Sequence, residues 1–525
     1  METIQDIDTF LSLRKSLLIS PAGYGKTYSI VQCVKRAEGK SLILTHTHAG
    51  VAAIKNALNN QAIDKQIYQI ETITSYAQKY VKAYCNEVFP PITPSEDYWL
   101  FVLEKAEQIL KNKHIKDVIG STYKHLFVDE YQDCTILQHK VILALSEILQ
   151  THILGDPLQG IMNFNKKDRL VSFYNDDLKE FIKVKELEKP YRWSKEGNNE
   201  VLGEYLKKIR NTLLKNIEND EHNNIDLNDN PNKAFCLIQT EGNAYSYDEI
   251  SKNTNKYNKD KNKNFTYQEL LRRIIQNNKN NPSLESLLII SNTPYNPKKT
   301  SVQIRAELKS RLYSPELNLL EAIDDESFYE VAKSADKVIC DGLKNNLKIL
   351  RDDFLLKIFV SSNTEMKKWI KDSYELVHKT KKSEILIYQN LLKYIEDFKK
   401  HPNGVILSKI VQLFYKDIGL KCSRTDFYNC IQNALLNTDE NKTVYDTMTA
   451  QRNKLRRVGR KVIGKCLGTV ALTKGLEFDT VIILDAHNFK SSKDLYVAMT
   501  RACKNLIIFS QKTILEPYNK RKSPR

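Results

Sequence analysis

The chain has 525 residues, which is too long for one ordinary core and predicts roughly two to four domains. Hydrophobic residues make up 41% and charged residues 27%, and no apolar stretch is long enough to span a bilayer, so a cytoplasmic protein without a membrane partner is expected. The nine cysteines form no C-x-x-C pair, which argues against a zinc site or a disulfide framework. The net charge of +16 favours a polyanionic partner such as nucleic acid, although lysine is abundant throughout.

A candidate phosphate loop lies near the N-terminus, in LLISPAGYGKTYSI. Phosphate loops follow the pattern G-x-x-x-x-G-K-[ST] between a strand and a helix, and Gly25, Lys26 and Thr27 match its end. Gly23 lies inside the turn, while the first glycine position of the pattern is Ser20 here. In such a loop, backbone N–H groups and the lysine bind phosphates and the hydroxyl holds Mg²⁺, so the segment predicts a nucleotide site.

A second motif, HLFVDEYQD, is an apolar strand that ends in two acids, Asp129 and Glu130. A carboxylate at a strand end beside the loop can hold the Mg²⁺ that Thr27 also contacts, so Asp129 is the expected metal ligand. Glu130 is placed to orient an attacking water or to take its proton. Burial right up to two consecutive acids costs free energy, which favours a functional pair over exposed acids that merely close a strand.

Short apolar runs alternate with helical patterns in two regions of the chain. The first region, residues 1–195, contains SLLIS, SLILTHT, HLFVDE and THILGD, separated by helical patterns such as AGVAAIKNALNN and TILQHKVILALSEIL. The second contains AFCLIQT, SLLIISN, GTVALTKG, TVIILDA and NLIIFSQ, and a long helical stretch that includes KSEILIYQNLLKYIEDFKK divides it. This alternation predicts an α/β fold with parallel sheets and inserted helices.

Four further motifs follow in order: ILGDPLQGIMNF, LEKPYRWS, GTVALTKGLEFDTVIIL and LYVAMTRACKNL. With them the chain resembles the UvrD/Rep/PcrA family of superfamily 1A DNA helicases. The resemblance implies two RecA-like parallel-sheet P-loop NTPase domains with helical insertions. It implies domain 1A at 1–75 and 118–195, a short insertion 1B at 76–117, domain 2A at 196–312 and 445–525, and a helical insertion 2B at 313–444.

The resemblance also assigns roles around ATP. Gln5 lies at about the family's spacing for the glutamine that reads adenine, and Glu477 resembles the ribose contact. Gln159 resembles the residue that senses the γ-phosphate and couples it to DNA. Arg192 and Arg501 resemble two arginines that bind the γ-phosphate from facing surfaces, and planar guanidinium groups suit that charge. Because these arginines come from different domains, hydrolysis is expected to open or close the cleft between them.

DNA contacts are implied in the same way. Thr45 and Thr47 lie in LILTHTHAG, which resembles the family's first strand-binding motif, and Thr72 lies in ETITSYA, which resembles its T-F-H-S motif. Phe164 is placed like an aromatic residue on which a base could stack, with packing in the core as the alternative.

The sequence therefore predicts an ATP- and Mg²⁺-dependent DNA helicase or translocase that moves 3′ to 5′ on single-stranded or tailed duplex DNA. Two departures from the family favour an alternative: a short first insertion, and Met162 for the usual tyrosine; Ala471 for the usual histidine weakens the implied grip on bases. That alternative is a DNA-stimulated ATPase switch or sensor that regulates a separate nuclease in antiviral defence, since compact UvrD-like proteins occur in anti-phage systems such as Gabija. An RNA-directed superfamily 1 helicase is a third reading.

Overall fold

The structure is a computed structural model, and the chain divides into two compact units. The larger unit comprises residues 1–321 and 461–525, and the helical unit comprises residues 322–460. The structure describes residues 7–90, 96–162, 167–195, 198–230, 233–240, 271–272, 274–275, 286–291, 308–309, 317–320, 326–344, 346–359, 362–422, 425–439, 441–458 and 464–518.

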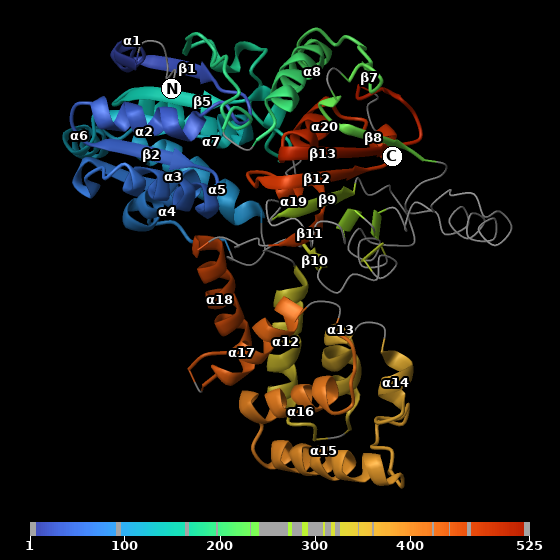
Figure 1. Ribbon diagram of the computed structural model, residues 1–525. Coiled ribbons are helices and arrows are strands. Elements are labelled where there is room, and N and C mark those ends of the chain that lie inside the picture. The colour runs from blue at the N-terminus through green and yellow to red at the C-terminus, as the bar shows by residue number, and fades with distance from the viewer. Residues whose placement is uncertain are drawn as a thin grey trace, which may run out of the picture. The chain divides into compact units, whose positions relative to one another are not determined.

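Six parallel strands form the first sheet of the larger unit (Figure 1): Lys15–Ile19 (β1), Ser41–Thr45 (β2), Tyr68–Thr72 (β3), His125–Val128 (β4), Gln150–Gly155 (β5) and Ile182–Lys183 (β6). Their order is β3-β2-β4-β5-β1-β6. Every residue of β2 and β4 is buried, as expected for apolar parallel strands covered on both faces. The register pairs Ile19 with Gly155 and Thr45 with Thr72, so the carboxyl ends of the strands meet at one edge.

A second parallel sheet has six described strands: Cys236–Gln239 (β8), Leu287–Ser291 (β9), Leu317–Leu319 (β10), Lys465–Gly468 (β11), Phe478–Leu484 (β12) and Ala502–Ser510 (β13). Their order is β10-β11-β9-β12-β13-β8. A small antiparallel pair, Ile225–Asp226 (β7) and Ile514–Leu515 (β14), also belongs to this unit. The two parallel sheets confirm the predicted α/β fold class. The domain ranges predicted above stay a prediction, and β10 lies in the second sheet although its residues were assigned to the helical insertion.

The helices of the larger unit begin at residues that satisfy their free backbone N–H groups. Thr47 caps α3 by accepting from Gly50 N, and Thr135 forms a reciprocal capping box with Gln138 at α7. The helices are Ile7–Ser12 (α1), Lys26–Arg36 (α2), His48–Asn60 (α3), Ile73–Tyr84 (α4), Glu96–Leu110 (α5), Lys113–Thr122 (α6), Ile136–Ser146 (α7), Glu200–Glu218 (α8), Val470–Thr473 (α19) and Ser492–Met499 (α20). Short 3₁₀ helices follow β4 at Tyr131–Asp133 (η2) and β5 at Pro157–Gln159 (η3).

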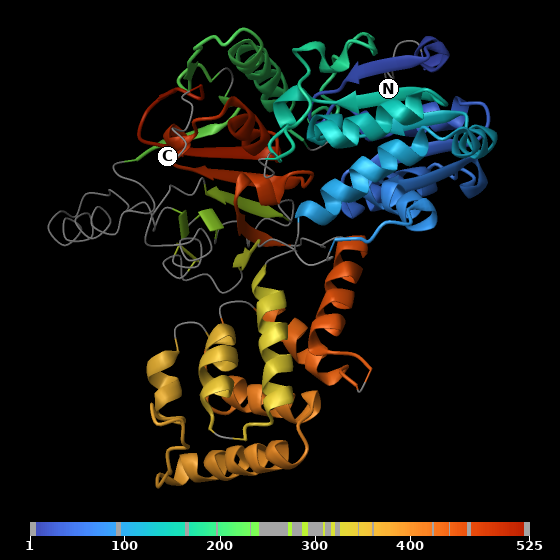
Figure 2. The ribbon, with the colours of Figure 1, turned by 180° about the vertical axis from the view of Figure 1, so that it is seen from behind.

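The helical unit is all-helical over its described residues, and Figure 2 shows its helices from behind. It has an apolar core of its own, which includes Phe328, Phe354, Phe398 and Phe414. Its helices are Glu326–Asp341 (α12), Ile349–Leu355 (η6, a π-helix), Leu356–Ile358 (α13), Asn363–Lys367 (α14), Lys382–Lys400 (α15), Gly404–Lys416 (α16), Thr425–Leu436 (α17) and Val444–Val458 (α18). In the part of the chain that the structure describes, no helix combines the length and apolar character needed to cross a membrane.

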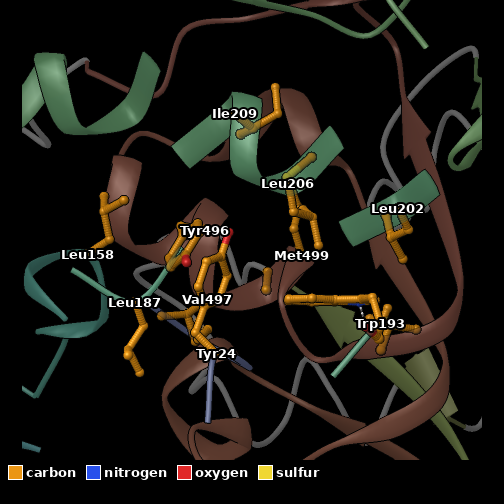
Figure 3. Close-up of a cluster of buried hydrophobic side chains, with 14 of the residues drawn as sticks. Tyr24, Leu158, Leu187, Trp193, Leu202, Leu206, Ile209, Tyr496, Val497 and Met499 are labelled. Atoms are coloured by element: carbon orange, nitrogen blue, oxygen red, sulfur yellow. Dashed lines mark hydrogen bonds between the residues drawn. The ribbon is translucent and has the colours of Figure 1, made fainter. Parts of the chain in front are cut away.

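One apolar core joins the two sheets of the larger unit. It contains Ile43 and Phe127 of the first sheet together with Val481 and Ile483 of the second. Figure 3 shows the part of this core that lies beside the phosphate loop. We call this part the junction cluster, and its labelled residues are Tyr24, Leu158, Leu187, Trp193, Leu202, Leu206, Ile209, Tyr496, Val497 and Met499. The indole N–H of Trp193 donates to Ala502 O at 2.7 Å, which satisfies the polar atom of this buried ring.

Most of the strands predicted from apolar runs are confirmed, and one is wrong. The apolar run GTVALTKG predicts a strand, but β11 ends at Gly468 and the run continues as the single helical turn α19. The buried KCLG segment before it forms the strand instead. The chain turns directly afterwards, and Gly475 ends this turn with a φ of 77°, a conformation that favours glycine.

Two buried histidines in the first sheet predict a loss of stability in acid. His152 Nδ1 lies 2.8 Å from Ser16 Oγ, and its Nε2 lies 3.2 Å from His125 Nδ1. Burial lowers the pKa of His152 to about 3 and also lowers the pKa of His125. Both side chains are therefore neutral in the folded protein. In the unfolded chain a histidine has a pKa of ~6.5, so both become protonated when the pH falls below that value.

Stability should thus fall as the pH drops from ~6.5 toward 3, and His152 alone should cost about 3 kcal/mol at pH 4 relative to pH 7.5. Urea denaturation at several pH values measures this slope. His152→Asn should flatten it, while the same change at the exposed His114 should not. Equal slopes for the wild type and His152→Asn would contradict the assignment.

Candidate nucleotide-binding site

The phosphate loop connects β1 to α2 and depends on two glycines with positive φ. Gly23 has φ 78° and Gly25 has φ 93°, a left-handed region that side chains rarely adopt. Gly23 also lies very close to the following motif: a Cβ placed on it would meet Arg192 Cβ at 2.8 Å and Trp193 Cζ3 at 2.9 Å. Arg192 N in turn donates to Gly23 O at 2.9 Å. The loop is therefore held against the Arg192 segment, and Lys26 and a partly exposed Thr27 begin α2 directly after it.

The Gly23→Ala variant should destabilise the protein through both backbone strain and overlap. A matched control is Gly419→Ala, because Gly419 has the same φ of 78° with no atom within 4 Å of its virtual Cβ. The control should cost about 1 kcal/mol from strain alone. Gly23→Ala should cost roughly 1–3 kcal/mol more from overlap with Arg192 and Trp193, as measured by chemical denaturation. Equal costs for the two variants would show that the close approach is not constrained.

The two predicted acids lie directly beyond β4 and pair with the lysine of the loop. Lys26 Nζ lies 2.7 Å from Glu130 Oε1 and 3.5 Å from Asp129 Oδ1. Asp129 is buried, and its Oδ1 accepts from Glu130 N at 2.9 Å. Glu130 has φ 55°, which turns the chain into η2 immediately after the strand. The sheet register thus brings together Lys26, Asp129 and Glu130, which are separate in sequence.

The charges of this group depend on one another. Burial alone would lower the pKa of Lys26, but Asp129 and Glu130 outweigh it and raise that pKa above its usual range. Burial raises the pKa of Asp129. For Glu130 the opposing attraction of Lys26 and Lys474 prevails over burial and lowers the pKa. Glu130 is therefore ionised at neutral pH and accepts hydrogen bonds, and its basicity would rise once Lys26 moves away.

Two arginines distant in sequence lie near each other here, Arg192 before α8 and Arg501 between α20 and β13. Arg192 Nη2 lies 2.7 Å from Glu477 Oε1 and its Nη1 donates to Thr500 O. Arg501 is 1% exposed, and its Nη2 lies 3.5 Å from Gln159 Oε1. Burial and the neighbouring Arg192 lower the pKa of Arg501 to about 10. Glu477 offsets the charge of Arg192, and the Arg501 guanidinium donates to Leu476 O at 3.1 Å and to Thr500 Oγ1 at 3.1 Å.

Sequence reasoning missed the residues that connect these groups. Gln132 donates to Glu130 Oε2 and accepts from Asp156 N at 3.0 Å. Asp156 Oδ2 accepts from Gln159 Nε2 at 3.0 Å and from Ala22 N at 3.2 Å. The chain Glu130–Gln132–Asp156–Gln159 therefore links the ends of β4 and β5 to the loop. Gln132 and Asp156 lie inside the motifs already named, but their hydrogen bonds to residues distant in sequence leave no local signal there.

The predicted DNA-contact residues lie at the carboxyl ends of β2 and β3. Thr45 is buried and Thr47 is exposed at the start of α3. Thr72 caps α4 by accepting from Ser75 N at 3.1 Å. Their contacts with DNA stay a prediction, and Gln5 and Phe164 lie outside the described residues.

Comparisons with known proteins agree with the site in coarse terms. The AAA domain family model matches residues 4–165, and the viral superfamily 1 RNA helicase core domain model matches residues 388–510. A search of curated proteins found no match. Neither model covers half of the chain, so these two matches show a likeness to superfamily 1 helicase domains over the matched residues.

Three solved structures illustrate that similarity. The arterivirus nonstructural protein 10 helicase with DNA is 14% identical, over 46% of this chain and 50% of that one, with a TM-score of 0.24. The Pif1 helicase from Bacteroides with ADP-AlF3 and ssDNA is 12% identical, over 99% and 94%, with a TM-score of 0.34. Bacteroides sp Pif1 with ADP-AlF4 is 16% identical, over 50% and 57%, with a TM-score of 0.27. The chain spans about half the length of the first of these structures, and at these values the alignments carry no functional argument.

Proposed function

We propose that the protein is an ATP-dependent DNA helicase or translocase that couples ATP hydrolysis to movement on single-stranded DNA. One observation supports this most: residues of both sheets meet around the phosphate loop. Lys26 and Glu130 come from the first sheet, and Arg501 and Glu477 come from the elements of the second. A nucleotide bound here would touch both sheets, so its hydrolysis can change how they fit together.

The loop residues suit ATP with Mg²⁺. Two glycines allow the loop backbone to approach the phosphates closely. Lys26 offers a positive charge to the β- and γ-phosphates once it leaves the carboxylates of Asp129 and Glu130. Asp129 supplies one buried carboxylate and Thr27 one hydroxyl, a sparse oxygen set that suits an ion held mainly by phosphates and water. Bound Mg²⁺ would neutralise phosphate charge. The Tyr191 ring lies 3.4 Å from the virtual Cβ of Gly25, which places a flat apolar surface beside the loop for a nucleobase.

Glu130 is proposed as the general base. It is ionised, and Gln132 holds its second oxygen, so one carboxylate oxygen remains to orient the attacking water when Lys26 turns to the phosphates. Arg192 and Arg501 would then bind the γ-phosphate as charge develops on it, and Gln159 lies between Arg501 and Asp156 to transmit this contact to the first sheet.

Nucleic-acid-stimulated hydrolysis tests the proposal. Single-stranded DNA should raise ATP turnover, and 3′-tailed duplex should be unwound while 5′-tailed duplex is not, if movement is 3′ to 5′ as in the UvrD/Rep/PcrA family. DNA affinity should fall with salt, with a log–log slope of about −0.7 per phosphate neutralised. Strand displacement and ATP turnover should be measured in parallel, with the DNA strand and with an RNA strand of the same sequence. Stimulation by RNA alone would overturn the DNA assignment.

A DNA-stimulated ATPase sensor that regulates a partner nuclease is the second candidate. It is favoured by the short first insertion and by Met162, which replaces the tyrosine expected in a base-gripping motif of the family. DNA-stimulated turnover without displacement of either tailed duplex would support it over the helicase.

A further inference from the structure

Lys474 makes a buried set of contacts between the two sheets of the larger unit. It lies in the turn between α19 and β12 of the second sheet, with a side chain 6% exposed. Its Nζ donates to Asp133 Oδ1 at 2.5 Å, to Asp133 Oδ2, and to Gln159 O at 2.5 Å. Asp133 ends η2 after β4 and Gln159 ends η3 after β5, so all three acceptors belong to the first sheet.

These contacts can be satisfied only when the two sheets lie together. Taking an ammonium group and a carboxylate out of water costs several kcal/mol each, and this is offset only if the geometry is good and the remaining donors are bonded. Lys474 meets that condition, because its three acceptor contacts match the three hydrogens of an ammonium group. The contacts need Lys474 from the second sheet and Asp133 from the first. They therefore favour one relative position of the two sheets, in which the sheets lie together.

The same contacts fix the residue that links the arginine to the nucleotide site. Lys474 binds the main-chain oxygen of Gln159, while the Gln159 side chain lies between Arg501 Nη2 and Asp156 Oδ2. We propose that Lys474 is a positioning residue that sets Gln159 when the sheets close, and so sets Arg501 for the reaction. This inference rests on the proposed function, but the contact itself can be measured separately from ATP turnover.

The test uses the full chain and measures both the contact and its effect. Lys474→Met removes the charge and keeps a long side chain, Lys474→Arg keeps the charge, and Lys504→Met is the matched control because Lys504 pairs with Asp479 at 2.8 Å within the second sheet. Hydrogen exchange of residues 156–162 and 470–478 is followed without nucleotide, and DNA-stimulated ATP turnover is measured separately.

Lys474→Met should speed exchange in both segments and lower kcat about tenfold with little change in KM. Lys474→Arg should have smaller effects on the exchange rate and on kcat, and Lys504→Met should change neither quantity. Unchanged exchange in Lys474→Met would overturn the positioning role, and so would faster exchange with wild-type kcat. If the wild type itself hydrolyses no ATP, the proposed function fails, while faster exchange in Lys474→Met alone would still support the closed contact.

Discussion

Glu130→Gln should still bind ATP but lose turnover by roughly 10²- to 10⁴-fold, because an amide cannot take the proton of the attacking water. The change removes one charge and preserves shape, so Gln132 can keep its hydrogen bond to position 130. Nucleotide binding is measured with a fluorescent ATP analogue, and turnover by phosphate release on single-stranded DNA.

Two variants make this result specific. Glu147→Gln makes the same chemical change at an exposed glutamate that pairs with Lys116, and it should leave turnover unchanged. Lys26→Ala should lose ATP binding as well as turnover, because it removes the charge that the phosphates need. Wild-type turnover in Glu130→Gln would remove the general-base assignment while leaving the loop as a nucleotide site.

Arg501→Lys and Arg192→Lys should each lower kcat by roughly 10³- to 10⁵-fold with much smaller effects on ATP affinity, since the charge matters most in the transition state. Lysine keeps a positive charge but lacks the planar fork of donors. It also limits the structural damage at Arg501, whose Nε donates to Val497 O at 2.9 Å inside the core. Single-turnover kinetics at saturating ATP measure the effect.

The double variant should cost much less than the sum of the two singles, because both arginines act on one closed arrangement. Arg169→Lys is the matched control, since this exposed arginine pairs with Asp177 in the connection between β5 and β6. Thermal unfolding of each variant separates lost folding from lost chemistry. Additive effects of the two replacements would contradict a shared transition state, and normal turnover of Arg501→Lys would contradict the two-sheet site.

The strands and the site residues were predictable to different degrees. Continuous apolar runs predict β2 and β4 because parallel strands are buried on both faces, and the motifs after them mark where the chain leaves the sheet edge. The run after β11 was misread because four β-branched or apolar residues fit either a strand or one turn of helix. Gln132, Asp156 and Lys474 could not be assigned roles, because hydrogen bonds between residues distant in sequence have no local pattern.

The junction cluster has a mechanical consequence. Tyr24 of the phosphate loop and Leu158 after β5 are packed there with Tyr496 and Met499 of α20, the helix that leads directly to Arg501. Separating these surfaces would expose apolar area at about 25 cal/mol per Å². We therefore expect the two sheets to rotate relative to each other about this cluster, which stays packed. Helix α20 should move with this rotation and carry Arg501 with it. Small changes at the γ-phosphate would then become larger displacements at surfaces farther from the pivot.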